Sequence, residues 1–443
     1  MSLISYESYT ERIQNLNCIK HFGKVTQVVG LVVESAGPAI SIGRLCTIEN
    51  RDTGIKVSAE VVGFRDDRLL LMPLGAINGI SPGAIVTSTS DQLRIPVGNE
   101  LIGRVLGGLG HPIDSKGPLF TKITKSINAD PIPALQRKRI DKPVRTGIKA
   151  IDIMAPVGQG QRMGVFAGSG VGKSVMLGMI SRGSSADINV IALLGERGRE
   201  VREFIERDLG PEGMKNSIVV AVTSDQPALI RIKGAMVATS IAEYFRDQGK
   251  NVLLMMDSLT RIAMAQREIG IAIGEPPTTK GYTPSVFALL PKLLERAGKT
   301  KRGSITGMYS VLVEGDDFNE PISDAVRSIL DGHISLSRKL ASMNQYPAVD
   351  VLDSISRLIK DISSEEEINL VGEVKQLVSI YREAEDLINI GAYVKGSNPK
   401  IDLAISKIDQ INDFFKQGIH EITDHSKSID RLKEIMIIEN QDK

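Results

Sequence analysis

The chain has 443 residues, of which 42% are hydrophobic and 24% charged, and this composition is typical of a soluble globular protein with two or three domains. Lys and Arg number 54 against 53 Asp and Glu, and the formal net charge of +1 argues against a nucleic-acid-binding protein, which usually has a basic excess. Two cysteines without metal-type spacing argue against a disulfide framework and indicate a reduced cytosolic setting. No apolar run reaches the ~18–20 residues of a membrane span, and the first residues lack the pattern of a signal peptide.

The first 22 residues contain a short amphipathic pattern. Apolar side chains stand at Leu3, Tyr6, Tyr9, Ile13 and Leu16, and these spacings of three and four predict a helix. Such a helix either packs against its own domain or docks a partner, and the pattern leaves both open.

Residues 23–96 are rich in short runs with high β propensity. Turn residues separate these runs, which lie at 24–29, 31–33, 56–62 and 69–72. Closely spaced strands of this kind predict a small antiparallel β-barrel. The following stretch, 97–150, is rich in Gly and Pro and is typical of a connecting region.

From 151 to 345, apolar strands alternate with longer helical patterns. This alternation predicts a parallel sheet covered by helices on both faces. Beyond 346 the strand signal fades, and repeated apolar positions among charges predict helices. Strands are predicted at 163–167, 188–194, 217–222, 251–256 and 304–312, and helices at 174–182, 200–209, 228–248, 258–269 and 284–297.

The strand at 163–167 leads into a Gly-rich turn and then into a helix opened by Lys173 and Ser174. This order matches a phosphate-binding P-loop, in which backbone N–H groups cradle phosphates, Lys173 neutralises the β- and γ-phosphates and Ser174 ligates Mg²⁺. The first position of the motif holds Ala167 instead of Gly, and an ordinary Gly-rich turn is the alternative. The sequence therefore predicts binding of a nucleoside triphosphate and Mg²⁺ by Ala167, Gly168, Ser169, Gly170, Val171, Gly172, Lys173 and Ser174.

Two carboxylates follow apolar strands, at the edge where a parallel sheet binds its ligands. Asp257 ends the run 251–257, about 80 residues after the P-loop, and is the predicted Walker B residue that supports the metal and its water shell. Glu196 follows 188–194 and is placed to orient a water for attack on the γ-phosphate. A helix-start acid favoured by the helix dipole is the alternative for Glu196, and spacing alone leaves both open.

Several motifs in order resemble the catalytic subunits of rotary ATP synthases and their relatives, the type III protein-export ATPases. The P-loop with segment 197–204, and the segments 274–277 and 281–287, resemble the flagellar export ATPase in particular. The resemblance extends from about residue 24 to the C-terminus and implies an α/β fold with a RecA-like P-loop core. The shared motifs are Gly195–Glu200 (GERGRE), Asp257–Arg261 (DSLTR), Tyr346–Asp350 (YPAVD) and Leu352–Arg357 (LDSISR).

The resemblance implies the same four-part organisation as the patterns above. We expect a docking helix at 1–22, a β-barrel at 23–96, a P-loop ATPase core with its linker at 97–345 and a helical C-terminal domain at 346–443.

The resemblance also implies roles for residues around the nucleotide. Glu196 corresponds to the glutamate that activates the hydrolytic water. Lys173 and Arg197 correspond to cations that contact phosphate, and Arg261 to a phosphate-side arginine. Tyr346 corresponds to the aromatic residue that packs on adenine, and a core residue at a domain junction is its alternative.

Arg357 corresponds to an arginine finger that reaches the γ-phosphate from a neighbouring subunit. A finger supplied in trans makes hydrolysis depend on assembly, because a lone subunit lacks that charge in the transition state. The alternative is a surface arginine in an ion pair.

For the whole protein the resemblance implies a Mg²⁺-dependent ATPase that forms a homohexamer and energises flagellar protein export, in the cytoplasm at the inner-membrane export apparatus. The implied partners are a peripheral-stalk-like regulator at residues 1–22, a central-shaft-like protein at the Gly/Pro-rich loop 270–284, an export gate, export substrates and chaperones, and no nucleic acid. An injection-type secretion ATPase is the nearest alternative. A ring-shaped RNA translocase is disfavoured by the neutral charge and the aromatic content of 4%, and a non-catalytic rotary subunit by Glu196 and Lys173.

Overall fold

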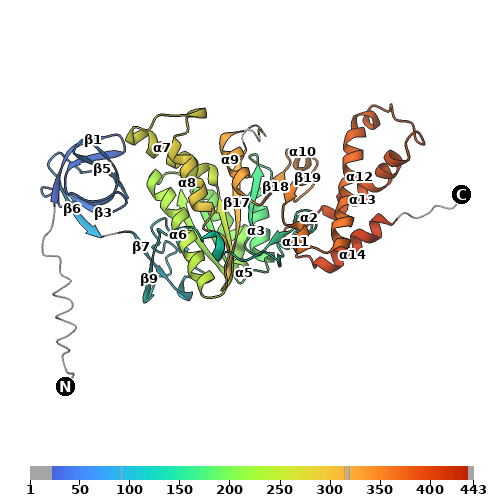
Figure 1. Ribbon diagram of the computed structural model, residues 1–443, viewed down its shortest axis with the longest axis horizontal. Helices are drawn as coiled ribbons and strands as arrows, with labels where there is room; N and C mark the ends of the chain where they lie inside the picture. The colour runs from blue at the N-terminus through green and yellow to red at the C-terminus, as the bar shows by residue number, and fades with distance from the viewer. Residues whose placement is uncertain (1–21, 91, 314, 316, 318–319, 438–443) are drawn as a thin grey trace, which may run out of the picture. The chain divides into compact units, whose positions relative to one another are not determined.

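The computed structural model describes residues 22–90, 92–313, 315, 317 and 320–437 (Figure 1). The helix predicted within residues 1–22 lies outside the described residues, apart from Phe22. The chain forms two compact units, of which the first comprises the residues up to Leu93 with Ile271–Glu275, and the second the remainder. None of the described helices is both long enough and apolar enough to span a membrane.

The first unit is a closed antiparallel β-barrel, as predicted. Its strands pair in the order β1-β2-β5-β4-β3-β6, and β6 closes on β1. Val33, Ile48, Val61, Leu71 and Val86 are all fully buried in its core. Closure leaves no unpaired sheet edge, which a small barrel otherwise has to protect. The strands are β1 (Phe22–Val29), β2 (Val32–Ala36), β3 (Leu45–Glu49), β4 (Lys56–Arg65), β5 (Arg68–Pro73) and β6 (Ile85–Ser90).

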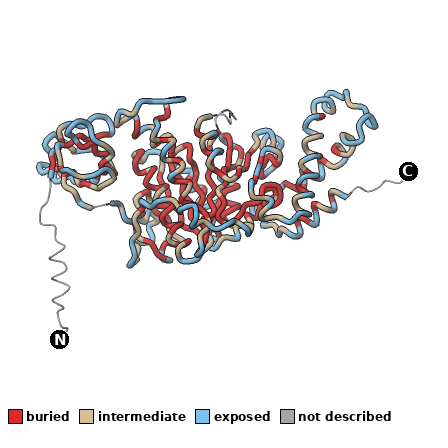
Figure 2. Tube along the Cα trace, in the orientation of Figure 1, coloured by how far each residue is buried: buried red, intermediate tan, exposed pale blue. Residues whose placement is uncertain are grey.

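The second unit is built on one large sheet of order β19-β18-β12-β17-β15-β13-β14-β8, with β16 paired to β17 beside it. The strands from β18 to β8 run parallel, and β19 is antiparallel to β18. Buried residues concentrate in this sheet and in the helix faces that cover it (Figure 2). The strands are β8 (Val105–Leu106), β12 (Arg162–Ala167), β13 (Ile188–Glu196), β14 (Ser217–Thr223), β15 (Asn251–Asp257), β16 (Gly298–Lys299), β17 (Ser304–Leu312), β18 (Gly332–Leu336) and β19 (Val349–Ser356).

Helices connect these strands, close to the predicted positions. The predicted helix 200–209 is divided between α4 and the π-helical turn η3. The segment 270–284, predicted as one long loop, begins inside α7, which continues to Ile273. Gly270 packs closely on Thr283, and a Cβ there would lie 2.4 Å from the Thr283 Oγ1. The helices are α2 (Lys149–Met154), α3 (Lys173–Gly183), α4 (Gly198–Glu203), η3 (Phe204–Leu209), α5 (Gly210–Met214), α6 (Ala228–Asp247), α7 (Leu259–Ile273), η4 (Thr279–Gly281), α8 (Pro284–Leu294), α9 (Pro321–Ile329) and α10 (Arg338–Ser342).

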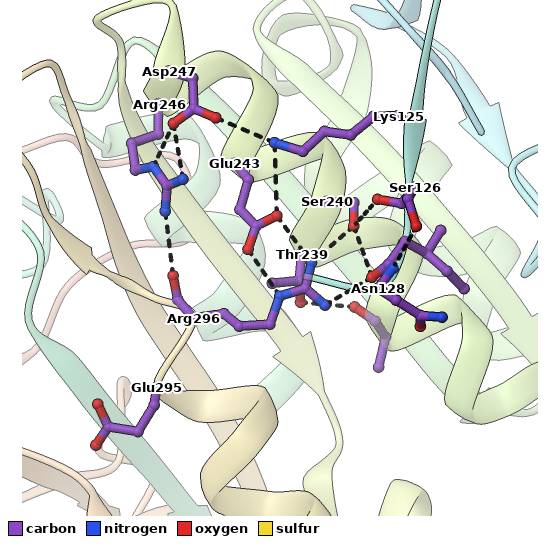
Figure 3. Close-up of polar contacts among 12 residues, drawn as sticks. Lys125, Ser126, Asn128, Thr239, Ser240, Glu243, Arg246, Asp247, Glu295 and Arg296 are labelled. Carbon is purple, nitrogen blue, oxygen red and sulfur yellow. Dashed lines mark hydrogen bonds and ion pairs between the residues drawn. The ribbon is translucent and has the colours of Figure 1, made fainter. Parts of the chain in front are cut away.

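The stretch 97–150, predicted as a connection, is fastened to α6 by a buried ion pair. The Arg296 guanidinium donates to both carboxylate oxygens of Glu243, at 2.8 and 2.9 Å (Figure 3). It also donates to the backbone oxygen of Ile127 at 3.0 Å. Ile127 directly follows β9, so the pair holds this segment on the helix. The further elements of this stretch are η1 (Asn99–Leu101), β9 (Ile123–Ser126), η2 (Ala134–Gln136) and β10 (Pro143–Val144). Strand β9 pairs with β7 (Arg94–Val97), and β10 pairs with β11 (Val157–Gly158).

The C-terminal region is helical, but it begins later than the predicted 346. Residues 349–356 form β19, the edge strand of the sheet. The sequence concealed this strand because Asp350 interrupts its apolar pattern. The structure buries Asp350, and a single nitrogen of Arg382 in α12, Nη2, donates to its two carboxylate oxygens at 3.0 and 2.9 Å. The helices that follow are α11 (Ile359–Ile362), α12 (Glu365–Asn389), α13 (Pro399–Phe415) and α14 (His425–Met436).

Candidate active site

The P-loop joins β12 to α3, and two glycines give it its shape. Gly170 and Gly172 have φ angles of 79° and 87°, in the left-handed region that glycine adopts at little cost. The first N–H groups of α3 lack helical partners and carry the positive end of the helix dipole, so the loop is suited to bind an anion.

Lys173 lies at the centre of a buried polar cluster. Its ammonium contacts the Asp257 carboxylate, and the Ser310 hydroxyl donates to the same carboxylate oxygen at 2.6 Å. An ammonium has three donors, so this contact leaves Lys173 able to bind a phosphate oxygen. Ser310 was not predicted; the only sequence signal was a polar residue near the end of the apolar run 304–312.

The oxygens near Lys173 fit a Mg²⁺ ion. This ion prefers oxygen ligands and usually keeps several waters while it binds substrate phosphates. Asp257 ends β15 and is buried, while Ser174 is exposed in the first turn of α3. The Ser258 hydroxyl beside Asp257 is buried without a hydrogen-bond partner among the described residues. The donor set therefore suits a metal held jointly by protein, phosphate and water.

Glu196 ends β13, close to Asp257 at the end of the neighbouring strand β15. Burial, then the negative charge of Asp257 and a hydrogen bond with Glu200, raise the pKa of Glu196 to about 7, against the opposing effect of Lys173 and Arg261. A carboxyl group with a pKa near neutrality can accept a proton from water and release it again.

The two arginines predicted beside the phosphates lie differently. The Arg261 guanidinium is 3.6 Å from the Glu196 carboxylate, and its Nε is buried with no hydrogen-bond partner within the described part of the chain. Arg197 is 79% exposed and pairs with Glu200 at 3.4 Å. The structure thus brings Arg261 to Glu196, whereas the Arg197 side chain extends into solvent.

Tyr346 lies against the P-loop. A Cβ on Gly172 would come within 3.3 Å of the Tyr346 ring, and the ring is nevertheless 41% exposed. The Gln417 N–H, after α13, donates to the Tyr346 backbone oxygen at 2.9 Å. A half-exposed ring beside the phosphate loop favours an adenine platform over a buried core residue. Arg338 also reaches the loop and donates to the Ser169 backbone oxygen at 3.3 Å, a contact that sequence reasoning missed.

Arg357 lies at the end of the parallel strands opposite to the P-loop. It follows β19, and its N–H donates to the backbone oxygen of Asp331 at 3.0 Å, directly before β18. Asp331 in turn binds Arg162, the first residue of β12, whereas the P-loop follows the last residue of β12. The two ends of this six-residue strand lie roughly 17 Å apart at ~3.3 Å per residue. Arg357 is therefore distant from the P-loop of its own chain.

Three family models match the chain. Residues 25–90 match the β-barrel domain of the ATP synthase alpha/beta family, and residues 147–356 match its nucleotide-binding domain. Residues 363–434 match the C-terminal domain of the type III secretion ATPase EscN.

Full-length relatives agree with these matches. The flagellum-specific ATP synthase of Bacillus subtilis is 54% identical over 418 residues, which cover 94% of this chain and 95% of the relative. That of Borreliella burgdorferi is 48% identical, over 97% of this chain and 99% of the relative. The type 3 secretion system ATPase of Xanthomonas euvesicatoria is 47% identical, over 94% of each chain.

Solved structures match as well. The assembled ATPase EscN of enteropathogenic Escherichia coli superposes with a TM-score of 0.89 and 45% identity, over 93% of this chain and 99% of EscN. EscN in complex with its central stalk EscO gives a TM-score of 0.86 at 44% identity, with the same coverage. The chain therefore belongs to the ATP synthase alpha/beta family, in its flagellum-specific and type III secretion branch, and it is an ATP-hydrolysing enzyme.

Proposed function

We propose that the chain hydrolyses ATP with Mg²⁺ as a homohexamer and thereby energises the export of flagellar proteins through a type III secretion apparatus. The observation that carries this proposal is that the proposed catalytic groups lie at opposite ends of the strands of one sheet. Lys173, Asp257 and Glu196 gather at the P-loop end, while Arg357 stands at the other.

At the P-loop end, Lys173 binds the β- and γ-phosphates, and Ser174 with Asp257 holds the metal. The Mg²⁺ ion, when bound, neutralises charge on the phosphates. Glu196 orients the attacking water and accepts its proton, and Arg261, 3.6 Å away, keeps the carboxylate in place. Tyr346 packs on adenine.

Arg197 acts in the proposed site of its own chain, whereas Arg357 acts in that of a neighbouring chain. Arg197 has to turn from its exposed position to reach phosphate. Arg357 serves the site of the neighbouring subunit, because a finger is useful only within reach of a γ-phosphate, and its own P-loop is at the far end of β12. Fingers of this kind raise hydrolysis rates by roughly 10³–10⁵.

The partners follow from the relatives and from the family resemblance. EscN has been solved with its central stalk, and we propose a shaft-like partner near residues 270–284 of this chain. We also propose a peripheral-stalk-like regulator at residues 1–22 and a cytoplasmic location at the inner-membrane export apparatus, with an export gate, substrates and chaperones as further contacts. Flagellum-specific relatives are 42–54% identical and type 3 secretion system ATPases 44–47%, so it is the upper end of the flagellar range that supports the flagellar system.

The substitution Glu196→Gln tests the chemistry. It keeps the shape of the side chain but removes the proton acceptor, so kcat is expected to fall by roughly 10²–10⁴-fold while ATP-analogue binding stays unchanged. Glu212→Gln, at an exposed carboxylate paired with Lys215, is the matched control and keeps wild-type turnover. Normal turnover in Glu196→Gln would remove Glu196 from its role.

Expression in a bacterium that lacks its own flagellar export ATPase tests the biological assignment. Restored secretion of flagellar proteins is expected. Rescue of an injection-type system alone would favour the alternative.

A further inference from the structure

A polar cluster with one fully buried and two partly buried side chains surrounds the main chain of Arg357, at the end of the strands opposite the P-loop. Its members are Gln161 and Arg162, at the start of β12, and Asp331, directly before β18. None of the three takes part in the chemistry described above.

Gln161 is fully buried, and its side-chain amide makes three hydrogen bonds. Its Nε2 donates to the Asp331 backbone oxygen and to the Ser356 hydroxyl, each at 3.1 Å, and its Oε1 accepts from the Gly158 N–H at 2.7 Å. The Asp331 oxygen is the same atom that accepts from the Arg357 N–H at 3.0 Å. The Gln161 amide thus holds two groups beside Arg357. One is Ser356, the preceding residue, and the other is the Asp331 backbone oxygen that accepts from the Arg357 N–H.

Asp331 is itself held by Arg162. Both carboxylate oxygens accept from the Arg162 guanidinium at 3.0 Å, and one also accepts from the Arg162 N–H at 3.1 Å. The backbone closes the arrangement, because the Asp331 N–H donates to the Arg162 oxygen at 2.9 Å. A bidentate pair of this kind fixes geometry as well as charge.

The Arg357 side chain, in contrast, is exposed and makes no hydrogen bond or ion pair within the part of the chain that the structure describes. The cluster therefore acts on Arg357 through its backbone and fixes the point from which the side chain extends. A fully buried amide and an arginine–carboxylate pair cost desolvation, and an edge hairpin alone can be built from apolar residues.

We propose that Gln161 and Asp331, with Arg162, are positioning residues that aim Arg357 at the γ-phosphate bound by the neighbouring subunit. This inference rests on the proposed role of Arg357 in trans. A displacement of about 1 Å of a catalytic group costs roughly 10²-fold in rate, so a precise anchor has a clear use.

The first test uses Asp331→Asn and Gln161→Met, which keep side-chain size and remove the charge or the amide. Each is expected to lower kcat by about 10- to 100-fold with little change in KM for ATP, because nucleotide binding belongs to the P-loop of another subunit. Glu212→Gln is the matched control. Thermal melting and ATP-analogue binding show whether each variant folds, and either folded variant is sufficient. Misfolding of both, or normal kcat in a folded variant, would overturn the proposal.

The second test mixes defective subunits in one assembly. Asp331→Asn co-assembled with Lys173→Ala is expected to regain activity above either variant alone, because some interfaces pair an intact P-loop with an intact finger. Asp331→Asn with Arg357→Ala is expected to regain none, because both damage the same half of the site.

The reference mixture, Arg357→Ala with Lys173→Ala, separates the two proposals. If it regains activity and the Asp331→Asn mixture with Lys173→Ala does not, Asp331 acts within its own subunit and the inference fails. If the reference mixture itself regains nothing, the finger in trans fails, and the inference with it.

Discussion

At the scale of single residues, the environment of Glu196 determines its chemistry. The side chain is mostly buried beside Asp257, and both circumstances disfavour a second negative charge. Lys173 and Arg261 oppose this effect only in part. The outcome is a pKa of about 7, near the working pH of a general base.

The raised pKa predicts a pH-dependent rate. Below pH 7 Glu196 is largely protonated and cannot accept a proton, so kcat/KM for ATP is expected to rise about tenfold per pH unit and to level off above pH 7. Steady-state kinetics between about pH 5.5 and 8.5, where both the protonated and the ionised form of Glu196 are populated, measure this dependence of kcat/KM. Glu200→Gln is expected to lower the midpoint, since Glu200 contributes to the raised pKa. An unchanged midpoint there, or a flat wild-type profile, would contradict the assignment.

Tyr346 offers a second prediction at this scale. Stacking of a base on an aromatic ring is worth about 1–3 kcal/mol, so Tyr346→Ala is expected to weaken ATP binding by roughly 5- to 150-fold. Tyr346→Phe keeps the ring and is expected to bind as the wild type does. Calorimetric titration with an ATP analogue measures both. If Tyr346→Ala instead lowers the melting temperature and leaves affinity intact, the residue is a packing residue.

At the scale of elements, β12 connects the P-loop with the residues that hold the backbone of Arg357. Its last residue leads into the P-loop, and its first residue holds the anchor of Arg357. A short strand in the middle of a parallel sheet is fixed on both sides, by β17 and β18, so both ends keep a defined position.

The buried ion pair between Glu243 and Arg296 holds the segment 97–150 on α6. Glu243→Ala is expected to cost about 3–5 kcal/mol of stability, because it leaves a buried guanidinium uncompensated, at side chains only 3% and 4% exposed. The double variant Glu243→Leu with Arg296→Met is expected to recover much of the loss. Thermal and urea unfolding measure both effects.

The exposed pair of Arg202 and Glu206 supplies the control for that prediction. Its loss through Glu206→Ala is expected to cost only about 0–1 kcal/mol. Equal losses for Glu206→Ala and Glu243→Ala would show that burial of the pair is unimportant.

At the scale of the whole molecule, the proposed mechanism assigns both halves of a catalytic site to one chain, which cannot bring them together. Lys173 and Arg357 are separated by the length of β12. Two neighbouring chains can complete the site, if the P-loop end of one meets the Arg357 end of the next. A closed ring repeats this head-to-tail contact at every interface.

Specific ATPase activity is therefore expected to rise with protein concentration as chains assemble. Arg357→Ala is expected to abolish the rise, because the added subunits then bring no transition-state charge. ATPase assays over a dilution series, with native mass measurement at each concentration, test this. A specific activity that does not depend on concentration would argue against catalysis in trans.

The sequence by itself determined the features that depend on local patterns. The strand and turn at 163–174 carry the P-loop, apolar runs ending in Asp257 and Glu196 mark two strand ends, and closely spaced β runs predict the barrel. These hold because residue spacing along a strand or turn directly fixes where backbone and side chains lie. Only the tertiary structure decided which residues meet across the sheet. Ser310 beside Asp257, Arg338 beside the P-loop, the buried Asp350 that conceals β19 and the anchor at Gln161 all arise from pairings between distant segments, and such pairings leave no local pattern in the chain.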